Sequence, residues 1–403
     1  MRNKLPAVAV LLGVLLVALW PTIAWSGRSH NALAANPTPT VIATLNVGDL
    51  PVGVAVNATL NRIYVTNEFS NNVSVINGAS NSITPTGIFG SSPYGVDVNP
   101  TNNRIYVANW DGNNVSVIDG TPGSPTENTV TATVTVQTHP VGVGVNPTTN
   151  RTYVANQWSN SVSVIEGVTN PPIKTVTVGI GPLWVAANPT TNRIYVTNET
   201  SNSVSVIDGT LGSPTENTVI DTVTVGSNPW GVAVNPTTNH IYVANRYSNN
   251  VSVINGVTNA VNTITVGTEP YAVGANPTTN RVYVANYGGN NVSVIDGTPG
   301  SPTENTVIDT VAVGWHPTAV GTNPASNRIY VANSSDDTVT VIQDYPIPAP
   351  VGGIAEYPQL EPEALSNGGG SSGPNAFALG GFAAGGAVLL PAGAWYARRR
   401  WLG

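Results

Sequence analysis

Short runs of alternating apolar and polar residues fill the middle of the chain, and clusters of Asn, Pro, Thr and Gly separate them. In the stretch that begins at Pro140, the runs lie at 141–145, 151–155, 162–165 and 173–178. Alternation with a period of two is typical of β-strands, and Asn, Pro and Gly between such runs are typical of hairpin turns. The pattern therefore predicts units of consecutive antiparallel strands. Because residues 36–345 lack a sustained apolar period of 3.6, almost no helix is expected there.

A six-residue phrase, Arg-Ile-Tyr-Val-Thr-Asn at 62–67, marks the repeat, and variants of it return six more times. Its tyrosines are Tyr64, Tyr106, Tyr153, Tyr195, Tyr242, Tyr283 and Tyr330. They lie 41 to 47 residues apart, and every second unit is longer because it carries an extra loop that ends Gly-Ser-Pro-Thr-Glu-Asn. Repeats of this length with several strands each are typical of propeller blades. The sequence predicts an all-β, seven-bladed β-propeller of four-stranded antiparallel blades.

Two features of the pattern predict how the propeller closes and how its centre packs. The run 41–47 precedes any first strand, and the last unit ends at its third strand, 338–342. The N-terminal strand is therefore expected to complete the seventh blade and close the ring. In the run 52–56, one face carries Val and the other only Gly and Ala. A strand crowded near the axis needs such a small face.

The repeated phrase also carries a family resemblance. Residues 64–67 and 195–198 read Tyr-Val-Thr-Asn, and the other five copies read Tyr-Val-Ala-Asn. Over about residues 41–344 the chain resembles the YVTN-repeat β-propeller family of prokaryotic surface-layer and secreted or periplasmic proteins. The resemblance implies a seven-bladed propeller in an extracytoplasmic setting. Members resemble binding or adhesion modules more than enzymes, although related propellers include oxidoreductase subunits and lyases, so the site needs its own argument.

The two ends of the chain carry membrane signals. Residues 1–35 contain Arg2 and Lys4, then an apolar run and the small-residue pattern Ala32-Leu33-Ala34, which together predict a cleaved signal peptide or, alternatively, a retained anchor. The propeller is expected over 36–345.

A Pro/Gly/Ser-rich linker at 346–375 leads to 376–403, which is predicted to be a C-terminal transmembrane helix with a basic tail. Arg398, Arg399 and Arg400 follow the uncharged stretch directly and place the C-terminus inside. We therefore expect an extracytoplasmic protein anchored in the cytoplasmic membrane at the cell surface. A cleavable sorting signal would have a similar pattern.

Composition excludes several kinds of chemistry. The chain has no cysteine, which excludes disulfides, thiolate catalysis and thiolate-bound metals. The net charge is −7, and six of the eight basic residues in 36–345 occupy the first position of the repeated phrase, which indicates a structural role. Only Lys174 and Arg246 remain, too few for nucleic-acid binding through the backbone. Since residues 36–345 contain no phosphate-binding, HExxH or G-x-S-x-G motif, no cofactor, metal or catalytic residue is assigned.

One face of the predicted disc carries the variable residues. The turns between first and second strands are nearly uniform, whereas the second-to-third and fourth-to-first turns differ from blade to blade and lie on the opposite face. All five tryptophans of 36–345 fall in these variable turns. Loops on a rigid scaffold that carry exposed aromatics are typical of recognition surfaces. The candidate ligand-binding residues are Phe69, Tyr94, Trp110, Trp158, Trp184, Trp230, Tyr247, Glu269, Tyr271, Tyr287, Trp315 and His316.

Several interpretations of this face remain open. The aromatics either pack over the loops and cover the channel mouth, or form a stacking platform for an extracellular glycan, peptide or envelope protein. Acidic residues outnumber Arg246 there, which disfavours anionic ligands. A second hypothesis is a structural surface-layer or envelope component that self-associates. A third is an enzyme, a lyase or an oxidoreductase subunit, that uses His316 and Glu269.

Overall fold

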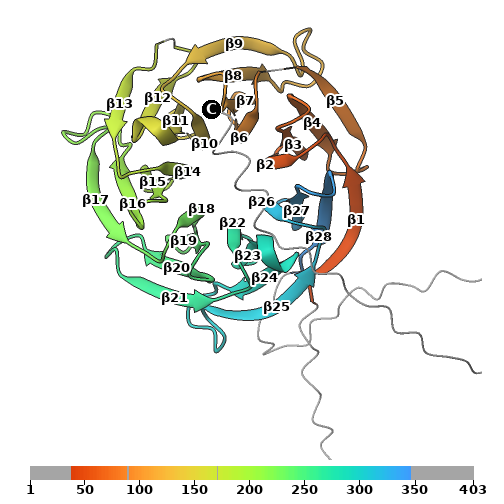
Figure 1. The fold of residues 1–403 in the computed structure, drawn as a ribbon, viewed down its shortest axis with the longest axis vertical. Coiled ribbons are helices and arrows are strands. Elements are labelled where there is room, and N and C mark those ends of the chain that lie inside the picture. Colours follow the sequence, from red (N-terminus) through yellow and green to blue (C-terminus); the bar gives the residue numbers. More distant parts are fainter. Residues whose placement is uncertain (1–37, 89, 170, 346–403) are drawn as a thin grey trace, which may run out of the picture. The chain divides into compact units, whose positions relative to one another are not determined.

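Seven four-stranded antiparallel sheets surround a common axis (Figure 1). The computed structural model describes residues 38–88, 90–169 and 171–345. The signal peptide, the linker and the C-terminal transmembrane helix expected from the sequence lie outside these residues. Within the described ranges, no helix is long and apolar enough to cross a membrane.

Blades 1 to 6 each run in chain order from an inner to an outer strand. Blade 1 consists of β2 (Pro51–Asn57), β3 (Arg62–Asn67), β4 (Asn72–Asn77) and β5 (Ile83–Ile88), and blade 2 of β6 (Pro93–Asn99), β7 (Arg104–Asn109), β8 (Asn114–Asp119) and β9 (Val130–Thr135). Blade 3 consists of β10 (Pro140–Asn146), β11 (Arg151–Asn156), β12 (Ser161–Glu166) and β13 (Lys174–Thr177), and blade 4 of β14 (Pro182–Asn188), β15 (Arg193–Asn198), β16 (Ser203–Asp208) and β17 (Val219–Thr224).

Blades 5 and 6 follow the same order, whereas blade 7 takes its outer strand from the N-terminal side of the propeller. Blade 5 consists of β18 (Pro229–Asn235), β19 (His240–Asn245), β20 (Asn250–Asn255) and β21 (Val261–Thr265), and blade 6 of β22 (Pro270–Asn276), β23 (Arg281–Asn286), β24 (Asn291–Asp296) and β25 (Thr306–Ala312). Blade 7 consists of β26 (Pro317–Asn323), β27 (Arg328–Asn333), β28 (Thr338–Gln343) and β1 (Thr40–Asn46). Across the described ranges, helical structure is limited to two single turns, η1 (Gln157–Ser159) and η2 (Tyr287–Gly289).

The N-terminal strand closes the ring, which confirms the prediction from strand counting. β1 pairs with β28 in antiparallel register, with Thr44 opposite Thr340, and supplies the outer strand of blade 7. Figure 1 shows the red β1 beside the blue β28. Both ends of the propeller thus belong to one sheet, and the blade at the seam has its full set of strands.

Small residues let the inner strands approach one another closely. A Cβ added at Gly95 would lie 2.1 Å from the Val141 carbonyl oxygen, and one at Gly142 would lie 2.4 Å from the Leu183 carbonyl oxygen. Both distances are far below van der Waals contact, so a side chain there would push neighbouring blades apart. The small face predicted for the innermost strands is therefore a packing requirement.

Hydrophobic packing joins each blade to the next. Tyr106 and Val115 of blade 2 pack with Val143 and Val154 of blade 3, and all four are buried. At the seam, Ile63 and Val65 of blade 1 pack with Tyr330 and Val339 of blade 7. The propeller is thus stabilised by a series of cores between blades.

The repeated polar residues also connect blades. A closed ring of seven side-chain hydrogen bonds, 2.7 to 3.3 Å long, runs around the first-to-second-strand turns. The donor and acceptor asparagines are Asn57 to Asn103, Asn99 to Asn150, Asn146 to Asn192, Asn188 to Asn239, Asn235 to Asn280, Asn276 to Asn327 and Asn323 to Asn61. The last of these crosses the seam. The uniform turns are therefore structural.

The repeated arginine has a structural partner on the next blade. Arg62 of blade 1 pairs with Glu127 in the extra loop of blade 2 at 2.5 Å. Arg193 of blade 4 instead donates to the Gly256 carbonyl of blade 5 at 2.7 Å, because blade 5 lacks the extra loop. The partner of the repeated arginine thus depends on whether the next blade carries the extra loop.

Candidate functional site

The variable turns lie together on one face, as predicted. In each blade the second-to-third-strand turn hydrogen-bonds to the turn that precedes the inner strand. The Trp110 N–H donates to the Ser92 carbonyl, and the Arg246 N–H donates to the Asn228 carbonyl, both at 2.9 Å. The sequence predicts a turn position for every candidate, but four of them are the second or third residues of inner strands, namely Tyr94, Trp184, Trp230 and Tyr271. We call the twelve candidate residues the aromatic face.

The turn before each inner strand uses a left-handed backbone. The residues with this conformation are Leu50, Ser92, His139, Gly181, Asn228, Glu269 and His316. Gly181 and Asn228 suit it, whereas Glu269 adopts φ 49° at a steric cost. A residue kept in such a conformation is a reason to ask what its side chain contributes.

A continuous run of rings crosses blades 5, 6 and 7. The Tyr271 ring centroid lies 4.2 Å from that of Trp230 and 5.1 Å from that of Tyr287. Tyr287 in turn stacks on His316, with centroids 4.4 Å apart and planes 14° apart. We call Trp230, Tyr271, Tyr287 and His316 the aromatic arc. Its geometry is that of attractive offset aromatic pairs.

Arg246 lies within the arc. Its guanidinium is 5.4 Å from the centroids of Tyr247 and Tyr271 and 5.9 Å from that of Tyr287, distances at which cation–π attraction is appreciable. Its Nη2 also pairs with Glu269 Oε2 at 2.9 Å. Burial alone would lower the pKa of Arg246, but Tyr271 and Glu269 outweigh it and raise the pKa above its ordinary value. The ion pair leaves this part of the face without net charge.

A second group of rings lies on blades 2 and 3. The His139 ring is 4.2 Å from Trp110 and 3.8 Å from Trp158, centroid to centroid. Burial lowers the pKa of His139, so its imidazole is neutral at neutral pH. Tyr94 and Trp184 form a further pair at 6.3 Å, although they come from blades 2 and 4.

Burial divides the aromatic face into two parts. Trp230 is only 7 % exposed and packs with Val141 and Leu183, so it covers the channel mouth. Phe69, Trp158, Tyr247 and Trp315 are 59 %, 64 %, 60 % and 62 % exposed. The inner part therefore fits the packing interpretation, whereas the exposed rim offers a surface that could bind a ligand.

The two residues of the enzyme hypothesis each have another partner. The Glu269 carboxylate pairs with Arg246, and His316 Nδ1 lies 2.7 Å from the Ser335 hydroxyl. Across the residues that the structure describes, no group of three or more His, Cys, Asp or Glu side chains could hold a metal ion. The geometry thus assembles an aromatic surface at these positions.

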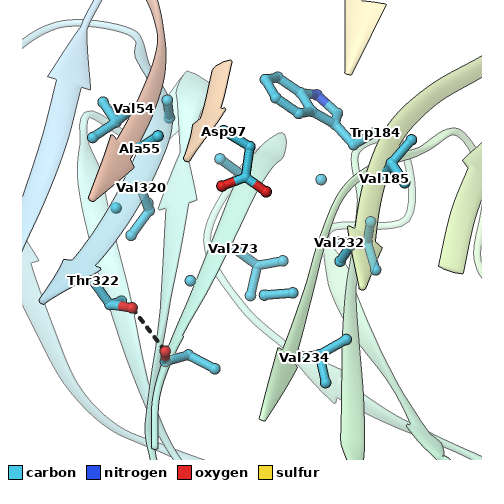
Figure 2. A pocket seen from close by; sticks show the side chains of 18 of the residues that line it. Val54, Ala55, Asp97, Trp184, Val185, Val232, Val234, Val273, Val320 and Thr322 are labelled. Atoms are coloured by element: carbon cyan, nitrogen blue, oxygen red, sulfur yellow. Dashed lines mark hydrogen bonds between the residues drawn. The ribbon is translucent and has the colours of Figure 1, made fainter. Parts of the chain in front are cut away.

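Sequence reasoning missed Asp97. This residue of β6 lines a cavity on the propeller axis, and Figure 2 shows its carboxylate inside that cavity below Trp184. Burial raises the pKa of Asp97 to about 6, although hydrogen bonds from the Val145 and Val98 N–H groups act in the opposite direction. Aligning the repeats would have revealed it, because the equivalent residues are Ala55, Gly144, Ala186, Ala233, Gly274 and Gly321.

Comparisons with known proteins support the fold. Residues 227–254, which lie in blade 5, match the NHL repeat. No curated protein sequence matches the chain. Among solved structures, a chain of Kuenenia stuttgartiensis hydrazine synthase is similar with a TM-score of 0.64 and 19% identity over 73% of this chain and 96% of that one. A chain of a mitotic checkpoint complex is similar with a TM-score of 0.65 and 16% identity over 86% of this chain and 98% of that one.

At these identities the structural similarity concerns the fold alone. The repeat match and the closed ring of seven sheets together define a seven-bladed β-propeller built from propeller-type repeats.

Proposed function

We propose that this propeller is an extracytoplasmic binding module of the YVTN-repeat type that holds its ligand on the aromatic face. The observation that carries the proposal is the aromatic arc with its two exposed neighbours. Tyr247 and Trp315 are 60 % and 62 % exposed at either side of stacked rings that are themselves fixed by packing. Rigid aromatic side chains of this kind offer large contact area at low entropic cost.

The chemistry of the arc favours a neutral ligand, and we propose an extracellular glycan. Because Glu269 neutralises Arg246, an anion would gain little from this guanidinium. Ring faces stack on the apolar faces of sugars, and the Arg246–Glu269 pair offers a donor and an acceptor for hydroxyl groups. A peptide or an envelope protein would use the same rings and is the other outcome of the test.

The test compares exposed residues of the face with exposed residues elsewhere. The double substitution Tyr247→Ala and Trp315→Ala should weaken glycan binding by about tenfold or more, because interface aromatics commonly contribute over 1 kcal/mol each. The matched control substitutes Leu211 and Val257, which are 53 % and 74 % exposed in connections between third and fourth strands. Glycan arrays followed by tryptophan fluorescence titration measure the affinity. Equal binding by the wild type and the Tyr247/Trp315 variant would refute the site.

The location at the cell surface is part of the proposal and depends on residues 1–35 and 376–403. The signal and anchor patterns in these segments support it. Cell fractionation tests it: the full-length chain should sediment with membranes, and a chain that ends at residue 375 should be released. Recovery of the full-length chain in the soluble fraction would contradict the anchor.

A second candidate function, self-association in a surface layer, is favoured by the outer strands. Ile220 of β17, Val261 of β21 and Val307 of β25 are 41 %, 37 % and 37 % exposed on strands that form the free edges of their sheets. Exposed apolar edges can pair with other chains. Light scattering over a range of concentrations distinguishes the two functions, since only the structural role predicts growth of the particle.

A further inference from the structure

A cavity of about 310 Å³ lies on the propeller axis, and the inner strands of all seven blades line it. Its wall consists almost wholly of Val, Ala and Gly, including Val185, Val232 and Val273 (Figure 2). Asp97 is the one charged residue among the described residues of this lining. The cavity thus combines small, mostly apolar side chains and exposed backbone with a single carboxylate.

The carboxylate of Asp97 has only neutral partners. Its Oδ1 accepts from the Val98 N–H at 2.8 Å, and its Oδ2 accepts from the Val145 N–H of blade 3 at 2.7 Å. No Lys, Arg or His belongs to the described lining. A carboxylate held in such surroundings is costly unless a cation joins it.

The fold does not need this charge. At the same position of the inner strand, blades 1, 4 and 5 carry Ala55, Ala186 and Ala233, and the remaining three carry Gly. The six blades with Ala or Gly at this position form the same four-stranded sheet. The acid of blade 2 is therefore not a requirement of the repeat.

Trp184 adds an aromatic surface to the cavity. It occupies an inner-strand position that is Gly or Ala in the other blades, and its ring reaches toward Tyr94 two blades away. Its indole Nε1 is buried and has no hydrogen-bond partner among the described residues. Aromatic faces attract cations, and alkyl chains pack against valine walls.

We propose that the axial cavity binds a primary alkylammonium group, carried either by a lysine side chain of a partner or by a free linear amine. The ammonium group donates to the free lone pairs of Asp97, and its methylene groups pack against the valines. This site shares Trp184 with the aromatic face but includes no residue of the aromatic arc, so it would stand even if that face bound no glycan.

Binding should depend on pH in a defined direction. Burial raises the pKa of Asp97 to about 6, so the carboxylate becomes fully ionised only above that value. No other residue that the seven inner strands contribute to the lining titrates in this range. An alkylammonium group stays charged to about pH 10. Affinity should therefore rise between about pH 5 and pH 7 and then level off.

The experiment is calorimetric titration of the full-length protein with n-butylammonium, with neutral n-butanol as the matched ligand. The amine should bind with a stoichiometry near one, and the alcohol should bind at least about tenfold more weakly, since hydrogen bonds to a charged group are the strong ones. Asp97→Ala should lose about tenfold or more in affinity for the amine. This variant should fold, because alanine is the residue of three other blades.

A second variant moves the site. Adding Ala233→Asp to Asp97→Ala places a carboxylate at the equivalent position of blade 5 and should restore amine binding. A lysine-containing peptide and the same peptide with acetyl-lysine distinguish the two sources of the ammonium group. If the lysine peptide binds and its acetylated form does not, the site accepts a partner's side chain. If n-butylammonium binds too, the site also accepts a free amine. Equal binding of amine and alcohol, or undiminished amine binding by folded Asp97→Ala, would overturn the proposal.

Discussion

Asp97 and the buried asparagines show how single residues in a repeat differ in role. Asn67 donates to Asn72 Oδ1 at 2.7 Å and to Ser74 Oγ at 2.9 Å, and the same pattern recurs in other blades. Asn72 and Ser74 therefore serve the hydrogen bonding within the sheet. Asp97, in contrast, departs from its repeat and has no equivalent. A departure at a position of otherwise uniform residues is the stronger indication of function.

The raised pKa of Asp97 makes a prediction about stability. Its folded-state value of about 6 exceeds the ordinary value of 3.8, so the native state binds more protons than the unfolded state between these values. Stability should therefore fall as pH rises from about 4 to above 6, by roughly 2–3 kcal/mol from this group. Asp97→Ala should lack this decrease, and chemical denaturation at pH 4, 5, 6 and 7 measures it. Parallel profiles for the two proteins would contradict the assignment.

At the scale of elements, the contacts between blades are unequal. Arg281 of blade 6 and Asp344, which follows β28, form an ion pair at 2.8 Å with side chains 2 % and 0 % exposed. Asp344 also accepts hydrogen bonds from Thr279 and Asn276. The Arg62–Glu127 pair, in contrast, is 22 % and 25 % exposed. The buried network at Asp344 should therefore stabilise the contact between blades 6 and 7 more than the partly exposed pair stabilises the contact between blades 1 and 2.

This difference in burial predicts that removing the acid of each pair will cost different amounts of stability. Asp344→Ala should destabilise the propeller by about 3–5 kcal/mol, because it leaves the Arg281 charge buried and unpaired. Glu127→Ala should cost about 0–1 kcal/mol, since its pair is screened by solvent. Urea denaturation of both variants gives the comparison. Similar losses in the two proteins would show that burial does not govern these pairs.

The sequence predicted the strands and the ring well, and the site only in part. Alternation, Asn-rich turns and the unpaired strand at 41–47 each have a local cause, so they could be predicted from the sequence alone. The burial of Trp230 could not be predicted in this way, because it depends on Val141 and Leu183 of two other blades. Trp184 likewise lies near Tyr94, which belongs to a blade two steps away. Contacts between non-adjacent blades follow from the curvature of the ring, which the repeat does not encode locally.

At the scale of the whole molecule, stability depends on closure. β1 is the outer strand of blade 7 and covers the edge of β28. Its residues Ala43 and Leu45 also pack on the core at the seam. Without β1 the ring would keep its other strands but expose an unpaired edge next to buried apolar residues.

Deletion of residues 36–47 tests this role. The shortened chain should melt at a lower temperature and form larger particles in size-exclusion chromatography, because the β28 edge becomes free to pair with other chains. Deletion of 346–403 is the matched change at the other end and should leave the melting temperature of the propeller unchanged. A monomeric chain of unchanged stability without residues 36–47 would show that β1 contributes nothing to closure.

The shared sheet of β1 and β28 has a further consequence for the order of the chain. Since first and last strands are neighbours, the position of the natural termini is one choice among seven similar places on the ring. Joining residue 345 to residue 38 by a short linker keeps Asp344, and opening the chain in a connection between two other blades then gives a circular permutant with the same contacts. The architecture belongs to the ring, and the point at which the polypeptide begins is incidental to it.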